Sequence, residues 1–89
     1  MLNKEGEYYL RSGIINQAVK DYREALKKLK RKGYINRDCE LVDPEYEIEP
    51  PWLVKLECER FFQSDWFGFL SDEVDGQIII DRVRDEVMR

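Results

Sequence analysis

The sequence predicts an all-α fold, a small bundle of one long helix and two or three shorter helices. Apolar residues recur at three- and four-residue spacing over residues 13–32 and again over 76–88. All three prolines lie between the periodic segments or at the start of one, where they do not interrupt a helix. At 89 residues, the chain is expected to form one domain, residues 1–89.

The long helix is expected over residues 13–32. Its apolar spacing is sustained over more than four turns, so one face should be buried. Ser12 is the expected N-cap, and Gly33 offers the left-handed residue that commonly ends a helix. Residues 1–11 could form a short helix or a flexible arm, and we favour the arm because Ser12-Gly13 interrupts the pattern.

Residues 34–50 are expected to form an extended acidic loop. Prolines and the alternation of Tyr46 with Ile48 argue against a helix there. Residues 38–49 contain six acidic residues and no basic one. Such a segment could occupy the basic groove of a nucleic-acid-handling protein, or it could be a solvated linker. The carboxylates assigned to a partner contact are Glu45, Glu47 and Glu49.

Two helices are expected next, over residues 51–63 and 65–71. Pro51 suits a first helical position, where the backbone N–H is not needed. Ser64 followed by Asp65 is a typical N-cap with an acid in the first turn. Five of the eleven aromatic residues fall in residues 58–70, so this stretch should build the core. The aromatic residues that could instead contact a partner are Trp52, Trp66 and Phe67.

The last helix is expected over residues 76–88, opened by Asp75-Gly76. Its run of three isoleucines also fits a strand, but the later valines continue the run at helical spacing. Oxygen-bearing side chains in residues 71–75 resemble the start of an EF-hand calcium loop. Position 12 of that loop would fall on Arg82, a cation where the metal needs a bidentate carboxylate, so we interpret Asp75 as an N-cap.

Composition argues against several classes of function. The net charge of −4 argues against a general nucleic-acid or membrane-surface binder. Histidine, the commonest general base, is absent, and Cys58 has no histidine to activate it, so we expect a buried thiol and no enzyme. No cofactor or metal site is expected. The absence of a signal-peptide pattern and the presence of only two cysteines, which do not form a C-x-x-C pair, favour a cytoplasmic protein.

Basic residues gather in the segment before the acidic loop. Residues 12–37 carry eight bases and two acids, a net charge of +6. These bases could touch a phosphate backbone, or they could be a solvated helix face placed favourably at the negative end of the helix dipole. A nucleic-acid-binding accessory is therefore the alternative function, through Lys27, Lys28, Arg31 and Arg37.

Three stretches together resemble a family: residues 18–26, residues 57–67, and Asp75-Gly76 with Ile79-Ile80 and residues 84–87. They are similar to small, mostly uncharacterised proteins of prophages and other mobile elements in Gram-positive bacteria. The resemblance covers residues 14–88 and departs at the acidic loop. It implies a shared fold and a mobile-element setting, and no reaction or functional residue.

These observations favour a non-enzymatic accessory protein that acts by protein–protein contact. Inhibition of a host nucleic-acid-handling or defence protein is one form that we expect this to take. A self-associating module is a third hypothesis, which the molecular mass in solution would test.

Overall fold

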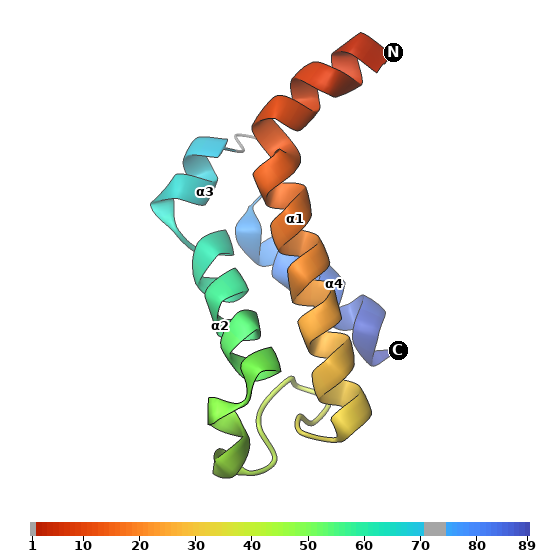
Figure 1. Ribbon diagram of the computed structural model, residues 1–89, viewed down its shortest axis with the longest axis vertical. Coiled ribbons are helices and arrows are strands. Elements are labelled where there is room, and N and C mark those ends of the chain that lie inside the picture. Colours follow the sequence, from red (N-terminus) through yellow and green to blue (C-terminus); the bar gives the residue numbers. More distant parts are fainter. Residues whose placement is uncertain (1, 71–74) are drawn as a thin grey trace.

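The computed structural model describes the backbone of residues 2–70 and 75–89, and the side chains of residues 13–69 and 75–89. The expected all-α fold is confirmed. The helices are α1 (Leu2–Lys32), the 3₁₀ helix η1 (Pro44–Ile48), α2 (Pro50–Phe62), α3 (Asp65–Leu70) and α4 (Gly76–Met88). In Figure 1, α1 and α2 lie side by side with α4 behind them, and α3 lies at the far end of α2 from η1.

The start of α1 corrects the expected arm. The helix runs unbroken from Leu2 through Ser12 and Gly13, so Ser12 is not an N-cap. A glycine in a helix interior costs only about 1 kcal/mol relative to alanine, and each residue added to an existing helix gains a hydrogen bond. In Figure 1 the first turns of α1 project beyond the rest of the bundle. The expected end holds, because Gly33 has a φ of 74° and donates its backbone N–H to the carbonyl of Lys30.

Contrary to our expectation, the acidic loop is not extended throughout, because residues Pro44–Ile48 form η1. Pro44 occupies the first turn of η1, where its missing N–H costs nothing, so this proline favours the helix that we had expected it to prevent. Asp43 caps η1 by accepting a hydrogen bond from the backbone of Glu45 at 3.0 Å. An isolated bridge pairs Ile35 with Leu41 just before this turn.

The aromatic corner between α2 and α3 forms as expected. Ser64 donates to the carbonyl of Phe61 at 2.7 Å and accepts from the backbone of Phe67 at 3.2 Å. The rings of Phe61 and Phe62 each meet Phe67 edge-on, with centroids 5.7 Å apart. Phe67 is thereby buried, whereas Phe69, two positions later, is 81% exposed.

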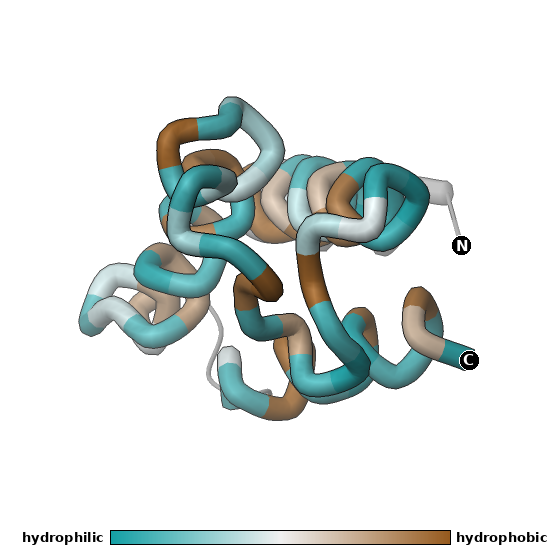
Figure 2. Tube along the Cα trace, turned by 90° about the horizontal axis from the view of Figure 1, so that it is seen from below, coloured by the Kyte–Doolittle hydropathy of each residue, from teal (hydrophilic) through white to brown (hydrophobic). Residues whose placement is uncertain are grey.

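Most of the core comes from α1, α2 and α4, and α3 and the segment after α1 add the rest. The tube in Figure 2 shows hydrophobic and hydrophilic residues alternating along the helices, as expected for amphipathic helices. Asp75 caps α4, as predicted, by accepting from the backbone of Gln77 at 2.9 Å. Gly76 lies so close to α2 that an added Cβ would stand 1.8 Å from the carbonyl oxygen of Phe62. The core residues are Ile15, Tyr22, Leu26, Leu29, Ile35, Cys39, Cys58, Phe62, Phe67, Ile80, Val83 and Val87.

Candidate functional site

The most prominent surface feature is the acidic turn, which we define as Glu45, Glu47, Ile48 and Glu49. The carboxylates of Glu45 and Glu47 lie in the first turn of η1, where negative charge is favoured. Both residues are exposed, and Glu49 is half-buried. Ile48 lies among them and is 78% exposed. Among the side chains that the structure describes, no ion pair neutralises these three glutamates.

Local contacts fix the acidic turn to the bundle. The ring of Tyr46 stacks on Tyr34, which follows the end of α1, with centroids 3.8 Å apart and planes 16° apart. Val42 donates its backbone N–H to the carbonyl of Tyr34 at 3.0 Å. The side chain of Asn36 accepts backbone hydrogen bonds from Asp38 and Glu40 at 2.8 and 3.0 Å. The glutamates are therefore presented by an anchored turn.

Two of the three predicted aromatic contacts, Phe67 and Trp66, do not form one surface with the acidic turn. Phe67 is 2% exposed, so its assignment to a partner contact is wrong: the corner at Ser64 turns its ring into the core. Trp66 is 54% exposed on α3. The 13 residues of α2 separate α3 from the acidic turn, about 20 Å at about 1.5 Å per residue. Figure 1 shows the two at opposite ends of α2.

Trp52 lies at the end of α2 next to the acidic turn and is half-buried. The amino group of Lys55 lies 4.3 Å from the centroid of its indole ring, which is a cation–π contact. The ring therefore covers a buried cation. A contribution of Trp52 to a partner contact stays a prediction.

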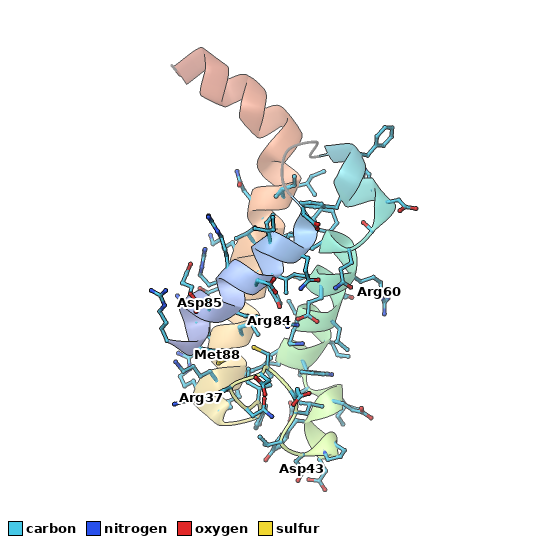
Figure 3. The ribbon with its side chains drawn as sticks, turned by 180° about the vertical axis from the view of Figure 1, so that it is seen from behind. Arg37, Asp43, Arg60, Arg84, Asp85 and Met88 are labelled. Atoms are coloured by element: carbon cyan, nitrogen blue, oxygen red, sulfur yellow. The ribbon has the colours of Figure 1, made fainter. Side chains whose placement is uncertain are left out.

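The basic side chains of the alternative function are all exposed. Lys27, Lys28 and Arg31 lie in the last two turns of α1, and Arg37 follows that helix. Within the described side chains, none of the four forms an ion pair with the acidic turn or with another acid. These four positive charges at the end of α1 are therefore not neutralised by ion pairs among the described side chains. Figure 3 shows Arg37 and Asp43 near the same end of the molecule.

A buried polar network joins the three main helices and was not predicted. It consists of Tyr22 from α1, Lys55 and Glu59 from α2, and Arg84 from α4. Glu59 is the common acceptor: Tyr22 donates at 2.5 Å, Arg84 at 2.7 Å and Lys55 at 3.1 Å. The Nε of Arg84 also donates to the Tyr22 hydroxyl at 3.1 Å. In Figure 3 Arg84 points between α4 and α2, whereas Arg60 points outward.

The network shifts the pKa values of Glu59 and Tyr22 in opposite directions. Burial alone would raise the pKa of Glu59, but hydrogen bonds from Arg84, Tyr22 and Lys55 together outweigh burial and hold that pKa below its ordinary value. Burial, reinforced by the hydrogen bond to Glu59, raises the pKa of the Tyr22 hydroxyl far above its usual range. Lys55 is 3% exposed and Tyr22 is fully buried. We interpret the network as a structural link between α1, α2 and α4, because the hydrogen bonds donated by Tyr22, Lys55 and Arg84 converge on Glu59.

A sequence signal for this network existed. Lys55 and Glu59 occupy the same face of α2 as Cys58 and Phe62, at three- and four-residue spacing. Charged residues on a core-facing stripe must find partners when they are buried. Arg84, which α4 contributes to the network, could not be predicted from the sequence, because its position depends on how α4 packs against α2.

Both thiols are free and buried, as expected for Cys58. Burial raises the pKa of Cys58 to about 11 and also raises the pKa of Cys39. Within the described residues no cluster of three or more potential ligands is placed to hold a metal ion. Residues 71–74 of the calcium-like stretch lie outside the described part of the chain. No helix in residues 2–70 or 75–89 is long and apolar enough to cross a membrane.

Comparison with known proteins does not assign the chain to a family. No protein-family model matches the sequence, and no curated protein and no solved structure matches it. The resemblance to prophage and mobile-element proteins therefore stays a prediction.

Proposed function

We propose that this chain is a non-enzymatic accessory protein of a phage or mobile element that binds another protein through the acidic turn. The partner surface is basic, as on a nucleic-acid-handling or defence protein of the host. The mobile-element setting depends on the sequence resemblance. One observation supports the proposed protein contact: glutamates without ion pairs among the described side chains surround the exposed Ile48 on a turn that the Tyr34–Tyr46 stack anchors.

The arrangement has the properties of a recognition surface. Clustered negative charge accelerates encounter with a basic surface and orients it. Ile48 supplies apolar area that partner binding would bury. The Tyr34–Tyr46 stack supports the proposal further, because an anchored turn loses less conformational entropy on binding than a mobile loop does.

Affinity capture from the native host tests the proposal. The tagged wild-type chain is compared with a triple variant carrying Glu45→Gln, Glu47→Gln and Glu49→Gln. The triple variant should fold normally and lose the protein that wild type retains. A matched control neutralises Lys27 and Lys28 instead and should retain it. Capture of the same protein by wild type and the triple variant would remove the acidic turn from the account.

A second candidate is a nucleic-acid-binding accessory that uses the basic end of α1. The observation in its favour is that Lys27, Lys28 and Arg31 are exposed and unpaired within the described side chains. Each phosphate contact should make the affinity fall as salt rises. A mobility shift with DNA or RNA at low ionic strength, lost when these three bases are neutralised, would favour this candidate over the protein contact.

A further inference from the structure

A groove runs between α1 and α2, on a surface to which α4 contributes no lining residue. It consists of two hollows of about 330 and 430 Å³. Asp21, Glu57 and Cys58 line both hollows, so the two lie next to each other along the helix pair. We call this feature the α1–α2 groove, and Figure 1 shows the two helices that form its walls.

The groove has an apolar lining that the bundle leaves partly uncovered. Ile14 on α1 is 49% exposed and Val54 on α2 is 37% exposed. On α2 the lining residues Pro50, Val54, Glu57 and Phe61 follow one another at intervals of four, three and four. The α1 wall has similar helical spacing. Two such stripes side by side are the usual seat of a further amphipathic helix.

The charge of the groove lining indicates which charge a bound helix should carry. Asp21, Glu24 and Glu57 line it, against the single base Lys28. Glu24 and Glu57 are exposed and form no ion pair among the described side chains. Asp21 accepts one hydrogen bond, from Gln17 at 2.8 Å. An occupant with bases beside its apolar stripe would neutralise these acids, whereas an acidic helix would be repelled.

The length of the groove sets the length of the occupant. From Ile14 to Lys28 the α1 wall rises about 21 Å, which corresponds to about 14 helical residues. We propose that the α1–α2 groove binds one amphipathic helix of about this length from another protein, with basic residues flanking its apolar stripe. This inference goes beyond the proposed function, because the groove shares no residue with the acidic turn.

Two synthetic helical peptides test the inference. Both have about 14 residues and the same leucine stripe, but one carries lysines beside the stripe and the other glutamates. Each is titrated into the ¹⁵N-labelled full chain. The lysine peptide should shift the amide signals of Ile14, Ala18, Val54 and Phe61 and bind at least about tenfold more tightly than the glutamate peptide.

Charge reversal provides the decisive variant. A chain with Glu24→Lys and Glu57→Lys should reverse the preference and favour the glutamate peptide, because both positions are exposed and unpaired among the described side chains. A chain with Glu45→Gln and Glu47→Gln should bind like wild type, which separates the groove from the acidic turn. Circular dichroism confirms that each variant is folded.

Several outcomes would overturn the inference. These are equal affinity for the two peptides, shifts confined to η1 or α3, and no binding by either peptide up to about 1 mM. A dimer in sedimentation equilibrium that Val54→Arg dissociates would also overturn it, since a second copy of the chain would then be the occupant.

Discussion

Replacing Glu59 by glutamine should destabilise the fold by about 3 kcal/mol at neutral pH. Glu59 is the acceptor for Tyr22, Lys55 and Arg84, and its side chain is 14% exposed. Removing one partner of a buried ion pair typically costs about 3–5 kcal/mol, because the other charge stays buried. We expect a cost at the lower end of this range for two reasons. The side chain of Arg84 is 35% exposed and can turn toward water, and the glutamine can still accept a hydrogen bond. The amino group of Lys55 cannot turn toward water in the same way, because its side chain is only 4% exposed.

Urea unfolding followed by far-UV circular dichroism measures this loss. Glu57→Gln is the matched control: it lies two positions away on the same helix, is exposed, and should change the unfolding free energy by less than about 0.5 kcal/mol. Adding Lys55→Met to Glu59→Gln should cost less than the sum of the two single changes, because the double variant leaves no buried lysine charge unpaired.

The loss of unfolding free energy caused by Glu59→Gln should also depend on pH. The pKa of Glu59 in the folded state lies below its ordinary value of 4.5, so its contribution is fully present above that value and is lost as the pH falls through the folded-state pKa. The difference between wild type and Glu59→Gln should therefore narrow in acid. A cost below about 1 kcal/mol at neutral pH, or a difference that widens in acid, would refute the assignment of Glu59 as the common acceptor.

Three further predictions concern packing, a thiol and a cap. Gly76→Ala should destabilise the fold by about 2 kcal/mol or more, because its Cβ would meet the Phe62 carbonyl. Gly13→Ala, whose Cβ would meet no neighbouring atom within 4 Å, should instead stabilise the fold by about 0.5–1 kcal/mol. Thermal unfolding compares the two variants, and equal changes in their melting temperatures would contradict the close approach of Gly76 to Phe62. Cys58 lines the α1–α2 groove but is only 8% exposed, so it should react with a thiol reagent much more slowly in the native chain than after unfolding. Because its pKa is raised from 9 to about 11, stability should fall as the pH rises between these values, and Cys58→Ala should lose part of that alkaline dependence. Labelling of the native chain at neutral pH as fast as labelling of the unfolded chain would contradict the burial. Asp75→Ala should cost about 1 kcal/mol in urea unfolding, and no loss would show that the cap is dispensable.

The later helices could be predicted from the sequence because local chemistry determines them. Ser64 and Asp75 form the caps expected of them, and Gly33 takes the left-handed conformation that ends α1. The start of α2 falls on Pro50, one residue before the expected position. Caps and first-turn prolines act within a few residues, so a short sequence window contains the needed information.

The failures have different physical origins. Ser12-Gly13 is a local break signal that helix propagation overrides. The 3₁₀ helix in the acidic loop has a local cap, Asp43, and a first-turn proline, and Tyr46 also stacks on Tyr34, a contact across twelve positions that periodicity cannot show. Arg84 reaches Glu59 across 25 positions, and only the packing of α4 brings them together.

The candidate surfaces were predicted only in part. The exposure of Glu45 and Glu47 follows from the composition of residues 38–49, because six acids in twelve residues cannot all be buried. Phe67 could not be separated from Trp66 and Phe69 as the buried ring, because a helix of six residues shows too little periodicity. The α1–α2 groove was missed because its residues belong to two helices whose pairing the sequence does not state.

The association rate between this chain and the protein that the wild-type chain captures tests the proposed contact through the acidic turn most directly. Measured at low and high ionic strength, the rate for wild type should fall steeply with salt, because the acidic turn steers a basic surface. The variant neutralised at Glu45, Glu47 and Glu49 should associate more slowly and show little dependence on salt. Equal rates and equal salt dependence for the two proteins would contradict the claim that the acidic turn is the contact.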